Sequence, residues 1–149
     1  MAQIGSDKYR YYNSLFAEAQ AVYHEYAVRQ GISDSISSIL YAIRTQGECC
    51  PIAKLCLDTG LSKQTVHSAL QKLEEQGLVR LEALDGKAKQ VRLTSAGKDY
   101  ARSRVEPLME MEDSIFCSWP EEKLDSYLRL TEDFLEALKE KVKEYRYVQ

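Results

Sequence analysis

The stretch that decides the fold is LSKQTVHSALQKLEEQGLV, which runs from Leu61 to Val79. Its apolar residues recur at three- and four-residue spacing, which is typical of a helix with one buried face. They are Leu61, Val66, Ala69, Leu70 and Leu73. Ser62 is a favourable N-cap residue, and Gly77 is favourable just beyond the last turn. The sequence therefore predicts an amphipathic helix between these two residues.

The other face of this helix carries side chains that donate or accept hydrogen bonds and are not anionic. Those gathered at its start are Ser62, Lys63, Gln64, Thr65, His67 and Ser68. No acidic residue occurs from Thr59 to Leu73, although the chain has a net charge of −3. A surface that approaches nucleic acid needs both properties, because a carboxylate would repel phosphate. An ordinary solvated helix face has the same composition, and for His67 both interpretations stay open.

Three helices are expected before this one. The first covers residues 8–30, and the second begins at Ser33 or Asp34. The third is short and opens at Cys50–Pro51, with Pro51 in the first turn, where its missing N–H costs nothing. This order, with a glycine turn before the fourth helix, is typical of a helix-turn-helix.

After Gly77 the apolar period changes from helical to two, which indicates strands. Asp85–Gly86 is a strong turn signal between the two alternating segments, so the sequence predicts a short β-hairpin. Thr94 is expected to cap a fifth helix that continues to about Cys117. Pro107 lies inside that helix and predicts a kink.

Ser118 and Glu121 have capping-box spacing, so a sixth helix is expected to begin there. The fold class is therefore mainly α with a small β-hairpin wing. The winged helix-turn-helix covers residues 33–94, and residues 8–30 and 95–147 form a separate helical region of the same domain. Because the second helix of such a motif enters the major groove by its N-terminal end, the polar cluster at the start of the fourth helix is expected to contact DNA.

Composition and charge agree with a globular protein that binds nucleic acid through one segment. The 149 residues are 44% hydrophobic and 29% charged. Residues 46–98 carry a net charge of +2, whereas residues 99–149 carry −5. No apolar run is long enough to span a membrane and no signal-peptide core occurs, so a cytoplasmic location is expected. The four cysteines are then expected to be free thiols.

The segments LSKQTVHSALQKLEEQGLVR and DGKAKQVRLTSAG closely resemble the MarR family of dimeric winged-helix transcription regulators. The residues that match the family pattern are Leu73–Glu74, Gly77–Leu78–Val79, Asp85, Leu93–Thr94 and Gly97. The resemblance follows the helix order over residues 8–145 and is motif-specific over 52–97. One departure is Lys87, which replaces the wing arginine of the family. Arginine suits a narrow minor groove better than lysine does, so the wing contact is expected to be weaker.

The resemblance implies a homodimer in which the first, fifth and sixth helices intertwine. It also implies wing contacts to DNA, for which the candidates are Lys87, Lys89 and Arg92. In the family a ligand often binds between the dimerisation region and the DNA-binding lobe. The residues themselves support a dimer, because residues 8–30 are apolar and aromatic yet too far in sequence from the wing lobe to be covered by it.

The tyrosines, cysteines and histidines leave alternatives open. Tyr12, Tyr23, Tyr26 and Tyr41 could line a pocket for a small aromatic ligand or pack in the dimer interface. Cys49 and Cys50 could form a thiol switch, with Cys50 expected to be the more reactive, or serve as small buried hydrophobes. His24 is expected to be an ordinary helix residue. Neither histidine has metal-ligand spacing with a cysteine, so no metal and no cofactor is expected.

The function expected from the sequence is a DNA-binding transcription regulator without membrane attachment. It would act as a repressor on a pseudo-palindromic operator, as a homodimer that responds to a ligand or to thiol chemistry. The alternative is a winged-helix protein–protein adaptor that does not bind DNA, which the net acidity favours. An enzyme is the least supported class, because the sequence shows no phosphate loop, catalytic triad or metal cluster.

Overall fold

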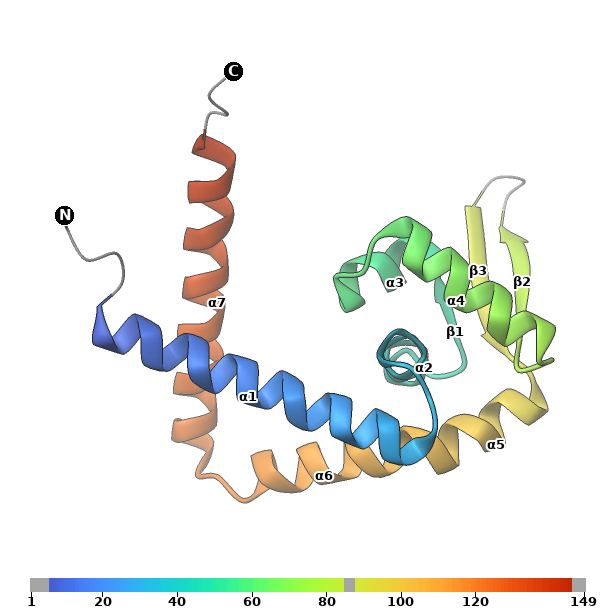
Figure 1. Cartoon of the computed structure of the whole chain (residues 1–149), viewed down its shortest axis with the longest axis horizontal. Coiled ribbons are helices and arrows are strands. Elements are labelled where there is room, and N and C mark those ends of the chain that lie inside the picture. The colour runs from blue at the N-terminus through green and yellow to red at the C-terminus, as the bar shows by residue number, and fades with distance from the viewer. Residues whose placement is uncertain (1–5, 85–87, 146–149) are drawn as a thin grey trace. The chain divides into compact units, whose positions relative to one another are not determined.

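A computed structural model describes residues 6–84 and 88–145 of the chain (Figure 1). Within these ranges it contains seven helices and three short strands. The helices are α1 (Asp7–Gln30), α2 (Asp34–Thr45), α3 (Ile52–Thr59), α4 (Lys63–Glu75), α5 (Ser95–Arg104), α6 (Glu106–Cys117) and α7 (Glu121–Glu144). The strands are β1 (Cys49–Pro51), β2 (Val79–Leu84) and β3 (Ala88–Leu93). Residues 1–108 and residues 109–149 form two compact units.

The core of the first unit lies among α2, α3, α4 and the sheet. Its fully buried side chains are Ile39, Leu40, Ile43, Leu55, Val66, Leu70, Leu73, Val79, Val91 and Val105. The predicted apolar face of α4 supplies several of them, so the helical period of the sequence is confirmed. Burying branched aliphatic side chains from α2, α3, α4 and the sheet fixes α4 against the sheet.

The sheet is antiparallel with strand order β1-β3-β2. The hairpin predicted from the alternating pattern is confirmed, and its register pairs Val79 with Leu93 and Leu84 with Ala88. The turn residues Asp85 and Gly86 lie outside the described residues. The sequence did not predict β1, which pairs Cys49 with Arg92 and Cys50 with Val91. Pro51 ends this strand and is the N-cap residue of α3, so its predicted place in the first turn is wrong by one position.

Three helices begin at the cap residues that the sequence indicated. Ser33, Ser62 and Thr94 each accept a hydrogen bond from a backbone N–H three residues later, in α2, α4 and α5. Such caps satisfy N–H groups that have no partner within the helix. Gly31, Gly60 and Gly77 follow helices with positive φ angles, where an L side chain would be strained.

Two predictions about the later helices are wrong. The fifth helix is not one kinked helix, because it breaks at Val105 into α5 and α6, next to Pro107. Proline has no N–H to donate and its ring crowds the preceding turn, which explains the interruption. The last helix does not begin at Ser118. Its N-cap residue is Pro120, and the Ser118 hydroxyl donates instead to the Ile115 carbonyl at 2.6 Å.

The C-terminal end of α1 is joined to α5 by side-chain contacts to the backbone. The Tyr26 hydroxyl donates to the Arg104 carbonyl at 2.9 Å, and the Arg104 guanidinium donates to the Gln30 carbonyl. Burial raises the pKa of Tyr26, and a hydrogen bond to the Leu108 backbone opposes this shift. The Arg104 guanidinium also lies at the C-terminal end of α1, where the helix dipole favours a positive charge.

The second unit contains most of α6 together with α7. At the turn between these helices Trp119 makes edge-to-face contacts with Phe116 and Tyr127, at ring-centroid distances of 5.6 and 5.5 Å. Beyond this cluster the apolar side chains of α7 are largely exposed, including Leu128, Leu135 and Leu138 at 46–52%. Within the described ranges every helix is too short or too polar to cross a lipid bilayer.

Gly97 generates the first prediction, because a Cβ atom there would lie 1.8 Å from the Leu78 carbonyl oxygen. The backbone of α5 or of Leu78 must therefore move in the Gly97→Ala variant. We expect a loss of about 2–3 kcal/mol in the free energy of unfolding, measured by urea denaturation. Ser95→Ala, at an exposed position two residues earlier, should change the stability by less than about 0.5 kcal/mol. Equal stability of the two variants would contradict the close packing.

Candidate nucleic-acid interface

The exposed face of α4 carries the predicted polar cluster. Lys63, Gln64, His67 and Ser68 are exposed, and the first turn of α4 contains no acidic residue. The opposite face is buried, so rotation of the helix is fixed and this polar face points to solvent. A helix of this kind presents donors and acceptors to base edges when its N-terminal end enters the major groove.

Two members of the predicted cluster, Ser62 and Thr65, also stabilise the start of α4. The Ser62 oxygen accepts from the Thr65 backbone N–H at 3.1 Å, and the two hydroxyls lie 2.8 Å apart. Thr65 is also half-buried. Ser62 and Thr65 therefore hold the start of α4 in place, and the longer side chains of Lys63 and Gln64 are better placed for base contacts.

A polar cavity of about 250 Å³ lies between the start of α2 and α4. Ser33 and Ser35 line it from α2, and Gln64, Ser68 and Lys72 line it from α4. Sequence reasoning missed Ser33, Ser35 and Lys72 as candidates. The spacing of Ser68 and Lys72 by four residues places both on one helix face and could have indicated Lys72. The approach of α2 was not predictable from local pattern, because it depends on tertiary packing.

The wing candidates point in different directions. Side chains alternate along a strand, so Lys89 shares a face with the buried Val91, whereas Arg92 points to the opposite face of the sheet. Lys89 is exposed and paired with Ala83 near the end of the hairpin. Lys87 lies outside the described residues. Of the described wing candidates, Lys89 thus lies on the core-facing side of the sheet and Arg92 on its outer side.

Arg92 is held by a carboxylate on the neighbouring strand. Its Nε atom donates to the Glu82 carboxylate at 2.9 Å, and the Gln90 amide donates to the same group at 2.7 Å. These hydrogen bonds, from Gln90 first and then Arg92, hold the pKa of Glu82 below its ordinary value. The predicted DNA contact of Arg92 is thus less favoured than that of Lys89.

The end of α4 is tied to the wing through Glu74. Its carboxylate accepts a hydrogen bond from the Leu81 backbone N–H at 3.3 Å. Leu81 belongs to β2, which is an edge strand of the sheet. The contact therefore couples the orientation of the hairpin to that of α4.

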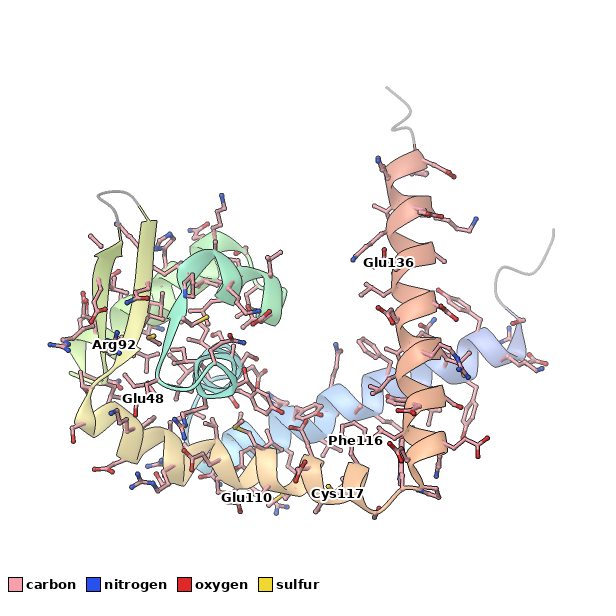
Figure 2. All side chains as sticks on the ribbon, turned by 180° about the vertical axis from the view of Figure 1, so that it is seen from behind. Glu48, Arg92, Glu110, Phe116, Cys117 and Glu136 are labelled. Atoms are coloured by element: carbon pink, nitrogen blue, oxygen red, sulfur yellow. The ribbon has the colours of Figure 1, made fainter. Side chains whose placement is uncertain are left out.

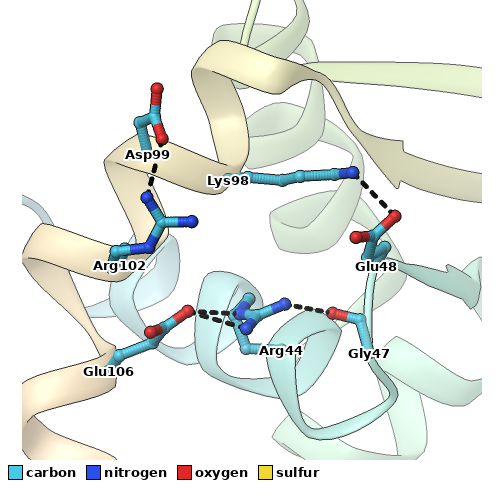
Figure 3. A network of polar contacts seen from close by, with 7 residues as sticks. All are labelled: Arg44, Gly47, Glu48, Lys98, Asp99, Arg102 and Glu106. Carbon is cyan, nitrogen blue, oxygen red and sulfur yellow. Dashed lines mark hydrogen bonds and ion pairs between the residues drawn. The ribbon is translucent and has the colours of Figure 1, made fainter.

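A second set of ion pairs links α2 and the β1 segment to α5 and α6 (Figure 3). Arg44 contacts the Glu106 carboxylate at 2.7–2.8 Å and donates to the Gly47 carbonyl at 2.7 Å. Lys98 contacts Glu48 at 2.8 Å, and this hydrogen bond lowers the pKa of Glu48. About three quarters of the Arg44 and Glu106 side chains are buried, which reduces screening by solvent.

The two adjacent thiols lie on opposite faces of β1. Cys50 is fully buried, and its Sγ lies 3.4 Å from the Pro51 carbonyl. Burial raises the pKa of the Cys50 thiol, which disfavours the reactive thiolate. Cys49 is half-buried and directly opposite Arg92 in the sheet. The structure therefore favours Cys49 as the more reactive thiol. The expectation that Cys50 is the more reactive one is contradicted by its burial, which raises the pKa of its thiol.

The four candidate pocket tyrosines are spread over two helices. Tyr26 is half-buried at the joint with α5, and Tyr41 is half-buried on α2. Tyr12 and Tyr23 are 44% and 48% exposed on α1. Since a helix rises about 1.5 Å per residue, Tyr12 lies about 16 Å from Tyr23, too far for one small ligand to touch both within a chain. His24, expected to be an ordinary residue, contacts the Asp34 carboxylate at 2.9 Å.

Residues 30–90 match the sequence model of the MarR family. That segment contains α2, the helix-turn-helix and most of the wing, the elements that form the polar surface. The match covers 61 of the 149 residues, and over this segment the chain is similar to the MarR family. No curated protein matches the sequence.

Solved structures share this fold over most of the chain. The structure of NMB1585, a MarR family regulator from Neisseria meningitidis, has a TM-score of 0.82 at 20% identity and covers 95% of this chain and 100% of its own. Sco3205 from Streptomyces coelicolor, solved in complex with DNA, has a TM-score of 0.67 at 18% identity, with 93% and 92% covered. BpsR from Bordetella bronchiseptica, whose DNA binding is regulated by 6-hydroxynicotinic acid, has a TM-score of 0.61 at 17% identity, with 82% and 96% covered.

The positions of the two thiols generate a prediction about their reactivity. N-ethylmaleimide added to the native protein should modify Cys49 well before Cys50, because only Cys49 is accessible on its face of β1. Cys50 should react at a comparable rate only in denaturant. Peptide mass mapping over time measures both rates, and the exposed Cys117 serves as an internal reference. Equal rates for Cys49 and Cys50 in the native protein would refute the assignment.

Proposed function

We propose that this protein is a transcription regulator that binds double-stranded DNA sequence-specifically, with α4 in the major groove. The observation that carries the proposal is the exposed, carboxylate-free first turn of α4, whose opposite face is buried. Gln64 and Lys63 would read base edges there, and Ser68 and His67 would add contacts farther along. The match of residues 30–90 to the MarR family model and the fold shared with a regulator solved on DNA support this function.

The surroundings of α4 suit the DNA backbone. Ser33 and Ser35 at the start of α2 and Lys72 on α4 border the polar cavity beside the proposed reading face. Hydroxyl and ammonium groups are common partners of phosphate oxygens, and such contacts set the register of a protein on the duplex. Lys89 would contact the backbone from the wing. A cytoplasmic location is part of this proposal, because the protein must reach DNA.

The proposed acting form is a homodimer on a pseudo-palindromic site with half-sites about one helical turn apart. Support comes from large apolar side chains that the single chain leaves exposed. They include Leu15, Phe16 and Val22 on α1, Met111 and Ile115 on α6, and Leu128, Leu135 and Leu138 on α7. Large apolar side chains exposed in such numbers on a helix are typical of a surface that packs against a partner. We assign it to a second copy of the chain, with residues 8–30 and 95–147 as the dimerisation region.

Regulation is proposed to be repression that a ligand or a thiol modification relieves. Tyr23, Tyr26 and Tyr41 are the candidates for an aromatic ligand, because they lie near the joint of α1 with the DNA-binding lobe. BpsR, which has this fold, is regulated by such a ligand. For thiol chemistry the candidate is Cys49, since β1 pairs with the wing strand β3. Either event would shift a two-state equilibrium between binding and non-binding forms.

The DNA-binding proposal predicts different effects for α4 and the wing. Gln64→Ala should flatten base preference at one position of each half-site, a loss of roughly 1–3 kcal/mol in discrimination. Lys89→Ala should weaken all duplexes alike and lower the slope of log affinity against log salt by about one per half-site. Selection of bound duplexes followed by salt titration by fluorescence anisotropy measures both effects.

The control for the DNA experiment is Lys141→Ala, which removes an exposed lysine from α7. Its operator affinity and salt slope should equal those of the wild type. Identical specificity profiles for Gln64→Ala and Lys89→Ala would count against the assignment of α4 to bases and the wing to backbone. Binding that is absent, or insensitive to salt, would favour the adaptor function.

The dimer proposal predicts a change in mass for Leu135→Asp. Leu135 is 47% exposed in the single chain, so the substitution should leave the chain folded. It would bury an unpaired charge only in the dimer, at a cost on the order of 3 kcal/mol or more. Sedimentation should find monomers, with an unchanged circular dichroism spectrum. Leu57→Asp makes the same change at an 83% exposed leucine of α3 and should remain dimeric. A Leu135→Asp variant at dimer mass would argue against this interface.

A further inference from the structure

Two arginines lie directly opposite each other on the outer face of the wing sheet. Arg80 of β2 pairs with Arg92 of β3 in the antiparallel register. Like charges at directly opposed positions destabilise a strand pair, so the arrangement calls for an anion. Glu82 supplies one only in part, because its carboxylate accepts from Arg92 at 2.9 Å but lies 4.0 Å from Arg80. The Arg80 side chain is 67% exposed.

These arginines border a surface cavity of about 400 Å³. Lys98 of α5 and Glu48 also line it, together with Thr94 and Ser95. The lining thus holds three cations and one carboxylate. Figure 2 labels Arg92 and Glu48, and Figure 3 shows the ion pair between Glu48 and Lys98. Glu48 pairs with Lys98, and Glu82, which is not in the lining, pairs with Arg92, so one positive charge of the cluster is left in excess.

The cavity is separate from the proposed DNA surface. Arg80 and Arg92 point away from the face of the sheet that packs on the core, where Val79 and Val91 are buried. Arg80 also lies four residues from Leu84, the last residue of β2, which corresponds to about 13 Å along the strand. Base or backbone contacts by α4 and the end of the wing therefore do not explain this concentration of positive charge.

We propose that the cavity binds a small oxyanion, a phosphate or carboxylate group bridged between Arg80 and Arg92. The contact of Arg92 to Glu82 uses Nε, and a guanidinium has several further N–H donors in the same plane. Two adjacent guanidinium groups match the oxygens of such a group in charge and geometry. The ligand adds an anion beside Arg80, whose own contact with Glu82 is long at 4.0 Å. Because both arginines belong to wing strands, occupancy adds a bridge between β2 and β3.

The test measures thermal unfolding of the full chain with millimolar inorganic phosphate or succinate, at ionic strength held constant with sodium chloride. The unfolding midpoint of the wild type should rise with at least one of these anions relative to chloride, because a ligand that binds the folded state stabilises it. Arg80→Gln should weaken the apparent affinity about tenfold or more. Arg102→Gln, which removes an equally exposed arginine from α5 (68%), should behave like the wild type.

The two anions distinguish the ligand classes. A response to phosphate alone assigns a phosphorylated ligand, a response to succinate alone assigns a carboxylate ligand, and a response to both assigns the shared oxyanion chemistry. The proposal is overturned if neither anion differs from chloride, or if Arg80→Gln and Arg102→Gln respond alike. The measurement contains no DNA, so its outcome is independent of the proposed DNA-binding function.

Discussion

The rest of the winged helix-turn-helix lobe depends on the close approach of α5 to the backbone of Leu78. The Thr94 N–H donates to the Leu78 carbonyl at 3.0 Å, and the Thr94 hydroxyl donates to the Gly77 carbonyl at 2.6 Å. Gly97 completes this junction because any Cβ atom there would collide with Leu78. The turn after α4, the end of β3 and the start of α5 therefore meet at one point. This junction fixes the helix that carries the polar face relative to the wing and to the helix that leads out of the lobe.

Several features of this lobe follow from local pattern and were predictable. The period of apolar residues in α4 and the change to alternation after Gly77 each describe one buried face, so both elements could be placed from sequence. The caps at Ser33, Ser62 and Thr94 are also local, because each hydroxyl contacts a backbone N–H three residues away. By contrast, β1 has only three residues and owes its conformation to pairing with β3, which lies about 40 residues later in the chain.

In the candidate site, too, the features set by local sequence were predictable, and those set by tertiary packing were not. Exposure of Lys63 and Gln64 follows from the amphipathic pattern of α4, whereas the contribution of Ser33 and Ser35 depends on how α2 packs beside it. The count of basic residues also did not show how Arg92 is held. Its position on the outer face and its contact with Glu82 depend on the register of the hairpin, which a count of basic residues does not contain. Burial similarly reversed the order of the two thiols, since neighbours in a strand point to opposite faces.

The hydrogen bond from Leu81 to Glu74 has a consequence for association between chains. β2 is an edge strand, and an edge strand with unpaired N–H groups is a template for pairing with another chain. Glu74 occupies one of these N–H groups from the end of α4, and the charged Arg80 and Glu82 flank it along the strand. These features oppose continuation of the sheet into a neighbouring molecule. The wing can therefore remain solvent-exposed at high protein concentration without starting intermolecular β-aggregation.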